Sequence, residues 1–568
     1  LRRQRQMCIR DSFNTVYASF DIWKGIKFAS TFSYDFVMNK SRAWKDPRTS
    51  DGDDDNGRFS KDYNDITNMT WSNILTYQTK IKKKHNLDLL AGYEINSKES
   101  DGLGTTISNF ARWDKPEVNN GVVYQSMGGS NSTTRIVSYI TRANYDYDNK
   151  YYLGASWRTD GSSRLARENR WGNFWSLSGA WRVSSESFMK PLQNWLSDLK
   201  LRVSYGVNGT LPSSYYGYMG LSSLTSNYND NPGIKQSQLE NKELTWETNY
   251  NFNSGIDLGF FDNRLNVTFE YYVRTTKNLL YSRPLSLATG FSSYLANIGK
   301  LQNKGYELEI RSTNIETKDF RWSTSLNLGH NANKILKLDG DLKQVTSGTS
   351  IHKVGLPYST YYMIEFAGID PVDGEPMFYK NTTDENGNLN KETTKDPRSA
   401  EKVILQCADP TITGGLGNSI SYKWFDLNFN VNFSFGAWNY DGAAGKLEHG
   451  GDGTLNIPIY YRKRWQKEGD ETSIERFVVG RSISMTDYAT TRRLYSGDYV
   501  RLKNLTFGFT LPKTWTRKVG IDNIRLYASG NNLLTWAAYD YIDPESGSSP
   551  SWDTPPMRTY TFGLEVKF

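Results

Sequence analysis

The stretch 425-FDLNFNVNFSF-435 decides the fold of this chain. Its apolar and polar residues alternate without interruption along the whole segment. Phe425, Leu427, Phe429, Val431, Phe433 and Phe435 have one parity, and Asp426, Asn428, Asn430, Asn432 and Ser434 have the other. Because successive side chains of a strand point to opposite faces, the pattern predicts a β-strand with one apolar face and one polar face.

The same alternation recurs along most of the chain, for example at 139–147, 199–207, 265–273 and 559–568. No comparably long stretch has a helical period, although a short helix is expected at 186–197. We count seventeen strands, at 12–22, 25–39, 66–81, 86–99, 134–147, 150–160, 171–184, 198–207, 243–259, 263–280, 301–314, 319–333, 411–422, 424–437, 497–511, 521–534 and 557–568.

The connections between these strands alternate in length. Short polar turns are expected at 24–25, 82–86, 148–150, 261–264, 316–320 and 422–424, and long linkers at 39–65, 100–133, 208–240, 282–299, 335–410, 438–496 and 537–556. Short turns at one end and long loops at the other are typical of a transmembrane barrel, whereas a soluble sandwich spreads its loops over both ends. An odd number of strands does not close a single-chain bacterial barrel, so we expect a miscount by one or missing first strands.

Composition narrows the class further. The chain has 568 residues and a net charge of only +7, which argues against nucleic-acid binding. Its mean hydropathy is −0.65, and it contains no run of 18 apolar residues that would make a spanning helix. Aromatic residues make up 14%, against 2 Cys and 4 His, which suits a sheet with one wet and one apolar face.

Five stretches carry a family resemblance: ASWRTDGSSRLARENRWGNFWSLSGAWR at 155–182, LKLRVSYGVN at 199–208, NIGKLQNKGYELEI at 297–310, the segment 354–379 with GIDPVDGEPMFY, and 531–568, which ends in MRTYTFGLEVKF. Together they resemble the SusC/RagA group of TonB-dependent outer-membrane transporters, from about residue 12 to the end. The resemblance implies an all-β fold, an antiparallel transmembrane β-barrel of 22 strands around an N-terminal plug.

The resemblance also implies a domain assignment. Seventeen strands that end at the C-terminus correspond to about the last seventeen of 22. Residues 12–568 are then expected to be a partial barrel domain that lacks the first strands and the plug. Residues 1–11, LRRQRQMCIRD, fit none of the patterns, and we interpret them as a non-native or artefactual leader.

The function implied by the resemblance is TonB-energised import across the cell outer membrane. Expected ligands are oligosaccharides or other large nutrients, with oligopeptides in some members. Expected partners are a SusD-like lipoprotein, the TonB complex through the missing N-terminal part, and membrane lipid. Two alternatives stay open: a passive porin-like channel, which shares the strand pattern, and a soluble surface glycan-binding β protein, which would have to cover the apolar face with a second sheet.

The two faces of the strands predict where each residue class lies. In a barrel the apolar side chains contact lipid and the polar side chains line the interior. Tryptophans near strand ends are expected in interfacial girdles, with ordinary sheet packing as the alternative for each one; they are Trp171, Trp175, Trp181, Trp246, Trp424, Trp438 and Trp536. The terminal Phe568 resembles the signal by which barrel-assembly machinery recognises its clients.

No motif predicts catalysis. The four histidines, His85, His330, His352 and His449, lack the spacing of a zinc site or a Ser-His-Asp triad, and neither GxSxG nor a Walker A loop is present. We therefore expect no enzyme, no catalytic residue, no cofactor and no metal. Cys8 and Cys407 are expected to be two unrelated thiols.

Two acidic segments and a set of loop aromatics remain as candidates. Asp51, Asp53 and Asp55 echo a calcium loop, but Asn56 replaces the turn glycine, which favours a solvated acidic loop and leaves calcium open. We interpret 370-DPVDGEP-376 as loop structure first and ligand contact second. Aromatic loop residues that could hold a glycan or a peptide, or simply pack in the loops, are Trp113, Tyr124, Tyr215, Tyr216, Tyr218, Tyr361, Tyr362, Tyr460, Tyr461 and Tyr541. The ligand-contacting residues, the ligand and the oligomeric state stay unassigned.

Overall fold

The structure is a computed structural model that describes residues 4–224, 227–229, 231–338, 342–385, 387–451, 456–480, 488–516, 518, 520–539, 541–546 and 555–568. Within these residues seventeen long strands belong to one antiparallel sheet. The α-helices of the same residues are one or two turns long, and none of them has the length and apolar character needed to cross a membrane.

The long strands are β1(Gln4–Trp23), β2(Ile26–Lys45), β3(Arg58–Ile81), β4(His85–Phe110), β5(Gly121–Tyr147), β6(Tyr151–Ser162), β7(Trp171–Arg182), β8(Leu196–Thr210), β11(Glu247–Phe260), β12(Leu265–Lys277), β15(Lys300–Glu316), β16(Phe320–Lys337), β24(Ile412–Tyr422), β25(Phe425–Phe435), β28(Tyr499–Thr510), β29(Asn523–Ala537) and β30(Thr559–Lys567). Each of the seventeen predicted strands corresponds to one of them.

The connections contain short elements. The strands are β9(Leu221–Ser223), β10(Lys235–Gln238), β13(Leu280–Pro284), β14(Ser293–Asn297), β17(Gln344–Ser347), β18(Ser350–Lys353), β19(Thr360–Ile364), β20(Phe366–Ile369), β21(Pro376–Tyr379), β22(Thr393–Thr394), β23(Lys402–Cys407), β26(Trp438–Tyr440) and β27(Leu494–Ser496). The helices are α1(Gly442–Leu447) and α2(Lys513–Thr516), and 3₁₀ turns lie at Val118–Asn120, Val183–Ser185, Ser187–Leu192, Leu287–Thr289, Pro397–Ser399, Ile459–Lys463, Thr491–Arg493 and Pro544–Ser546.

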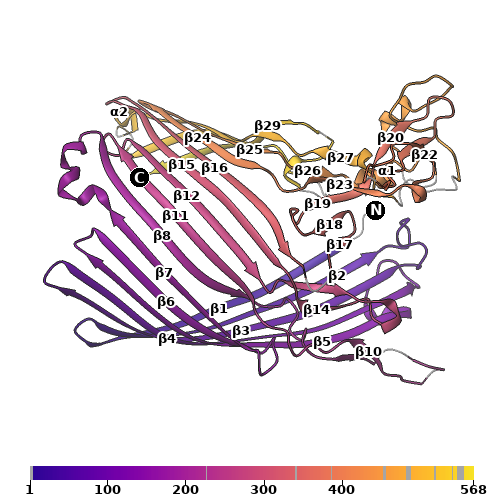
Figure 1. Cartoon of the computed structure of the whole chain (residues 1–568), viewed down its shortest axis with the longest axis horizontal. Helices are drawn as coiled ribbons and strands as arrows, with labels where there is room; N and C mark the ends of the chain where they lie inside the picture. The colour runs from indigo at the N-terminus through magenta and orange to yellow at the C-terminus, as the bar shows by residue number, and fades with distance from the viewer. Residues whose placement is uncertain are drawn as a thin grey trace. The chain divides into compact units, whose positions relative to one another are not determined.

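The chain forms two compact units, which we describe separately. Unit 1 comprises Leu1–Trp181, Val203–Phe252 and Thr276–Ile298. In it β1 to β7 form an antiparallel meander in which each strand pairs with the next, so that chain order is also spatial order (Figure 1). The pairing of β2 with β3 runs without a bulge from Ile26↔Tyr77 to Lys45↔Arg58.

Unit 2 comprises Arg182–Arg202, Asn253–Thr275 and Gly299–Phe568. Here β15, β16, β24, β25, β28, β29 and β30 form a second run of neighbouring antiparallel strands (Figure 1). Its long connections, 338–411 and 436–498, carry the small sheets β17-β18-β19-β23, β20-β21-β22 and β26-β27.

The apolar face of the strands lies at the surface. None of the six apolar residues that alternate along β25 is buried, and Phe425 and Phe435 at its two ends are exposed. On β30, Phe562 is 82% exposed and Leu564 is 61% exposed. The apolar side chains of the strands are therefore not gathered into a compact core, as a soluble sandwich would require.

Three predicted boundaries were wrong. The linkers expected at 39–65 and 100–133 are mostly strand, because the ladder continues through pairs such as Lys40↔Tyr63 and Gly102↔Ser130. These strand ends carry polar residues on both faces, so the alternation fades while the backbone hydrogen bonds continue. The first strand likewise starts at Gln4, and residues 4–11 pair with 37–44, so they continue the sheet whatever their origin.

The helix expected at 186–197 is also corrected. The segment forms the 3₁₀ turns Val183–Ser185 and Ser187–Leu192, and β8 starts at Leu196. Pro191 lies inside the second turn, where its missing N–H and its fixed ring do not allow a longer α-helix.

Candidate functional site

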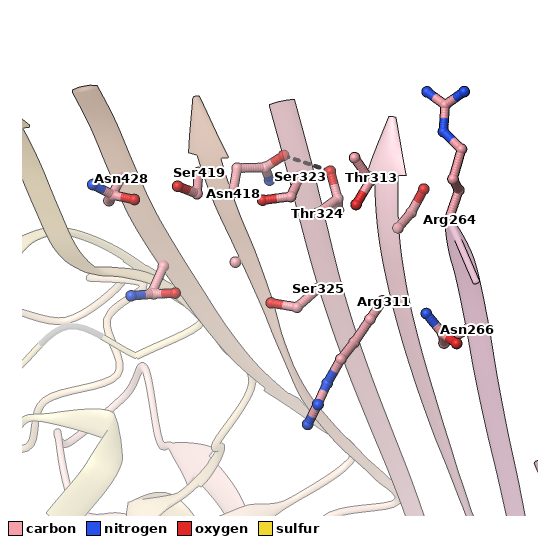
Figure 2. A pocket seen from close by; sticks show the side chains of 13 residues that line it. Arg264, Asn266, Arg311, Thr313, Ser323, Thr324, Ser325, Asn418, Ser419 and Asn428 are labelled. Carbon is pink, nitrogen blue, oxygen red and sulfur yellow. Dashed lines mark hydrogen bonds between the residues drawn. The ribbon is translucent and has the colours of Figure 1, made fainter. Parts of the chain in front are cut away.

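A polar pocket of about 320 Å³ lies on unit 2, on the strands β12, β15, β16, β24 and β25. Figure 2 shows its lining side chains on neighbouring strands, close to the ends that the short turns join. The lining residues are Arg264, Asn266, Arg311, Ser312, Thr313, Ser323, Thr324, Ser325, Gly417, Asn418, Ser419, Asn428 and Asn430. Hydroxyl, amide and guanidinium groups line the pocket, and its lining includes neither a carboxylate nor an aromatic ring.

The strand register builds the pocket from two rows. Thr313 pairs with Ser323, Ser323 with Ser419, and Ser419 with Asn428. The next row of the same face is Arg311, Ser325, Gly417 and Asn430. Directly paired residues share a face of the sheet, so the period of two in each strand becomes a two-dimensional polar surface.

The two arginines of the pocket do not form a clamp. Figure 2 shows the guanidinium groups of Arg264 and Arg311 pointing away from one another. Arg311 Nε donates a hydrogen bond of 2.6 Å to Glu309 on its own strand. Asn418 and Thr324 have the opposite parity and lie on the face of Phe429, where Asn418 Oδ1 accepts hydrogen bonds from Thr324 Oγ1 and Trp322 Nε1, at 2.8 and 2.9 Å. The pocket therefore offers neutral donors and acceptors to a polar solute and has no acid–base pair for catalysis.

Several charges elsewhere on this polar face are paired. Arg202 contacts Asp257 at 2.8 Å and Glu270 at 2.7 Å. Arg525 contacts Asp426 at 2.7 Å. Each ion pair joins side chains from different strands of unit 2, so it neutralises the charges and also links the strands.

The DPVDGEP turn is held together by two cations from other loop segments. Lys395 Nζ lies 2.6 Å from Asp370 and 2.7 Å from Asp373. Arg476 Nε lies 2.6 Å from Glu375. Hydrogen bonds from Lys395 lower the pKa of both aspartates. The carboxylates thus already have partners inside the loops, which agrees with a structural role; a ligand contact remains a prediction.

The long connections of unit 2 also contain a buried ion network that sequence reasoning missed. Arg492 Nη1 contacts Glu475 at 2.5 Å, and Glu475 is fully buried. Arg493 Nε contacts Glu448 at 3.3 Å, again between buried groups. Tyr461 Oη donates to Glu475 at 2.8 Å. These residues come from segments far apart in the chain, and no spacing in the sequence indicates that they meet.

Most of the candidate loop aromatics are engaged in packing. Tyr361 and Tyr461 are buried, and the Tyr361 hydroxyl accepts a hydrogen bond from the backbone of Tyr440. The Arg164 guanidinium lies 4.4 Å from the Tyr215 ring.

Two further candidate loop aromatics, Tyr216 and Trp113, also have partners within the protein. The Tyr216 hydroxyl accepts from the Thr133 backbone. The Arg48 guanidinium lies 3.4 Å from the centre of the Trp113 ring.

One exposed aromatic cluster remains in the loops of unit 2. Tyr541 is 68% exposed, and its ring lies 5.6 Å from that of Tyr460 and 5.3 Å from that of Tyr539. Tyr539 donates to Asp441 at 3.0 Å, and Tyr460 donates to Glu448 at 2.5 Å. Burial raises the pKa of both hydroxyls, so they stay neutral donors. A ligand contact by these rings remains a prediction.

The predicted tryptophan girdle is mostly at the surface. Trp171, Trp175, Trp181, Trp424 and Trp536 are exposed. Trp246 was assigned wrongly, because it is buried against Leu165 and Phe174 and donates to the Arg170 carbonyl. Trp438 packs against the buried cluster of Tyr361, Met363 and Leu494 instead.

The acidic segment 51–57 is a tight turn. Thr49 donates to Asp51, and Arg58 pairs with Asp55 at 2.8 Å. In the described part of the chain, no three His, Cys, Asp or Glu side chains are arranged to hold a metal ion. Cys8 and Cys407 are both free thiols.

Comparison with known proteins gives the family. Residues 9–533 match the family model described as TonB dependent receptor-like, beta-barrel. The chain is 32% identical to TonB-dependent receptor P3 of Formosa agariphila over 97% of this chain, and 30% identical to TonB-dependent receptor SusC of Bacteroides thetaiotaomicron over 76% of it. It spans 57% of the length of the first relative and 44% of the second.

A solved structure agrees. The RagAB peptide transporter superposes with a TM-score of 0.88 at 27% identity, covering 100% of this chain and 62% of that one. These comparisons confirm the resemblance to SusC and RagA, the transmembrane β-barrel fold and the outer-membrane location. The family consists of transporters and receptors rather than enzymes. This chain, with its apolar strand face at the surface and its polar face lined by hydroxyls, amides and paired charges, belongs to the TonB-dependent receptor β-barrel family of the outer membrane.

Proposed function

We propose that the intact protein imports an oligosaccharide or another large polar nutrient across the outer membrane, energised by TonB and assisted by a SusD-like lipoprotein. The observation that carries the proposal is the run of long strands in unit 2. Apolar side chains are exposed on one face of these strands, and rows of hydroxyls and amides line the other. Its likeness to SusC and to a peptide transporter supports import of a ligand in the glycan or peptide size class.

The polar rows are suited to conduction rather than to tight capture. Hydroxyl and amide groups exchange hydrogen bonds with a hydroxylated solute at little net cost. Where charges are paired, as in Arg525 and Asp426, they offer a passing solute no free ion to bind. Because a ligand shifts an equilibrium only by its differential affinity for two states, uptake against a gradient needs work from TonB.

We further propose that residues 12–568 belong to the barrel domain and that the intact receptor adds the first strands, a plug and the TonB-contacting segment. The support is that the curated relatives are much longer than the part of them that this chain spans. The interpretation of residues 1–11 as a leader of other origin is part of the same proposal.

The test is a tagged full-length receptor expressed in its own cells. We expect it in the outer-membrane fraction, with a lipoprotein partner that co-purifies in a one-to-one ratio. Recovery from the soluble fraction would reject the proposal.

A passive porin-like channel is the nearest alternative, and energy dependence separates the two. Collapse of the proton gradient, or deletion of TonB, should stop growth on the nutrient that the receptor imports. Uptake that continues unchanged would indicate a passive channel.

A further inference from the structure

Three short turns of unit 1 lie side by side and are rich in lysine. They join β1 to β2 at Lys24, β3 to β4 at residues 82–84, and β5 to β6 at residues 148–150. The Gln78 N–H donates to the Gly25 carbonyl at 2.8 Å, and the Asp148 N–H donates to the Lys84 carbonyl at 2.7 Å. The turn residues include the lysines Lys24, Lys82, Lys83, Lys84 and Lys150, against the single acid Asp148.

Three of these ammonium groups are available to a ligand. Lys84 Nζ lies 3.4 Å from Asp148, so this pair is partly neutralised. Lys24, Lys82 and Lys83 are exposed, and within the described residues none of them has an acidic partner. Lys82 and Lys83 have φ values of +49° and +63°, which makes a tight turn that leaves both side chains at its tip.

Aromatic and apolar side chains next to the turns set their depth in the membrane. Trp23 and Ile81, at the ends of β1 and β3, are 76% and 51% exposed. The rings of Tyr151 and Trp181, on β6 and β7, are both exposed and stack at 6.3 Å. Exposed rings at strand ends occupy the membrane–water interface, so the adjacent lysines lie at the level of the lipid headgroups.

The charge is specific to this end of unit 1. The turn at the opposite ends of β2 and β3, residues 46–57, carries Asp46, Asp51, Asp53, Asp54 and Asp55 against Arg48. In unit 2 two of the short turns carry both signs of charge, with Asp262 before Arg264 and Lys318 before Asp319, and the turn at 422–424 carries the single lysine Lys423. The cationic cluster is therefore not a general property of the short turns.

We propose that Lys24, Lys82 and Lys83 form a binding surface for the phosphate groups of anionic phospholipids in the periplasmic leaflet. Short turns of outer-membrane barrels lie on the periplasmic side, and each lysine near a membrane surface favours anionic lipid about fivefold. Three free ammonium groups beside an aromatic belt complement a layer of phosphates, with the rings against the glycerol and acyl region. This surface is independent of the transported ligand.

The test uses the intact receptor in detergent and short-chain phosphatidylglycerol or phosphatidylcholine as the probe, with bound lipid counted by native mass spectrometry. The variant is Lys24→Gln/Lys82→Gln/Lys83→Gln. The control is Lys115→Gln/Lys235→Gln/Lys242→Gln, which removes the same charge from exposed loop positions. We expect the wild type and the control to retain phosphatidylglycerol in preference to phosphatidylcholine. The variant should bind phosphatidylglycerol at least tenfold more weakly, and high salt should weaken the wild type similarly.

Each of the other outcomes overturns the proposal. Equal binding of both lipids by the wild type would show that charge is not recognised. An unchanged preference in the variant, with heat-modifiable migration proving that its barrel is folded, would place the lipid elsewhere. Retention of co-purified lipid A in place of the added phosphatidylglycerol would assign the surface to the other leaflet.

Discussion

Two regions of unit 2 use the same amino acids in opposite ways. In the strand wall, made of β15, β16, β24, β25, β28, β29 and β30, large apolar residues such as Leu526 and Phe562 are exposed. In the loop region, residues 344–410 and 438–496, Met363 and Phe378 are buried in small cores. The wall is apolar on the outside, and the loop region is organised like a small soluble protein.

The difference follows from the solvent that each region meets. Lipid offers no hydrophobic gain for burying an apolar side chain, so the wall is held by its backbone ladder and by its paired polar face. Water surrounds the loop region, so apolar burial drives its packing there. The same contrast applies to charge. In the loop region Glu475 is buried and the side chain of Arg492 is 11% exposed, while on the wall the side chains of Arg525 and Asp426 are 26% and 25% exposed.

The largest effect is expected from a substitution that breaks the buried ion network. Arg492→Met should leave Glu475 buried without its cation and destabilise the loop region by about 3–5 kcal/mol. Hydrogen exchange of segments 456–480 and 488–496 measures the loss. Arg321→Met, in the well-exposed Arg321–Glu316 pair of the wall, is the control and should cost less than about 0.5 kcal/mol. Equal effects would mean that the two regions do not differ in how they hold charge.

A second substitution tests which face of the strand wall meets lipid. Phe429→Arg puts a charge on the apolar face at mid-strand and should cost about 2–4 kcal/mol. Asn430→Arg, one residue along and on the polar face of the pocket, should be mild. Urea unfolding of the intact receptor in lipid vesicles compares them. Similar penalties at the two positions would contradict the lipid-facing assignment.

A smaller effect is expected at the polar face of the wall. Arg525→Met removes the contact with Asp426 between partly exposed groups, and we expect a loss of about 0.5–1 kcal/mol in the same assay. Asp426→Asn combined with Arg525→Met should cost no more than the single change. A loss as large as that of Arg492→Met would show that the wall interior excludes water as the loop region does.

The smallest expected effect is a change with pH in the stability of the Asp370–Asp373 turn of the loop region. Hydrogen bonds from Lys395 lower the folded-state pKa of Asp370 and Asp373 below the ordinary value of an aspartate, so their link stabilises the turn above about pH 4 and is lost as the pH falls further. Trp465 reports on this turn, because its Nε1 donates to the Pro371 carbonyl at 3.0 Å. Its fluorescence, taken as the difference from Trp465→Phe, should be constant from pH 7 to 5 and change below 4. Lys395→Met should abolish the step.

The sequence by itself determined the wall. A period of two, as in 425–435, is visible in one strand, because lipid on one side and water on the other impose it on every residue. It located each long strand and the short turns between them. It failed at 39–45 and 58–65, where polar residues lie on both faces and only the backbone pairing shows that the strands continue.

Only the tertiary structure decided the loop region and the composition of the polar surface. Glu475 and Arg492, or Asp370 and Lys395, meet through chain segments whose sequences carry no period, and Trp246 is buried because of neighbours that its own segment does not specify. The pocket arises when register aligns Thr313, Ser323, Ser419 and Asn428 across four strands. The physical reason is that the solvent on each face of a strand determines the alternation residue by residue along the chain. The partners in an ion pair, or the neighbours in a polar row, are instead fixed by contacts between distant segments.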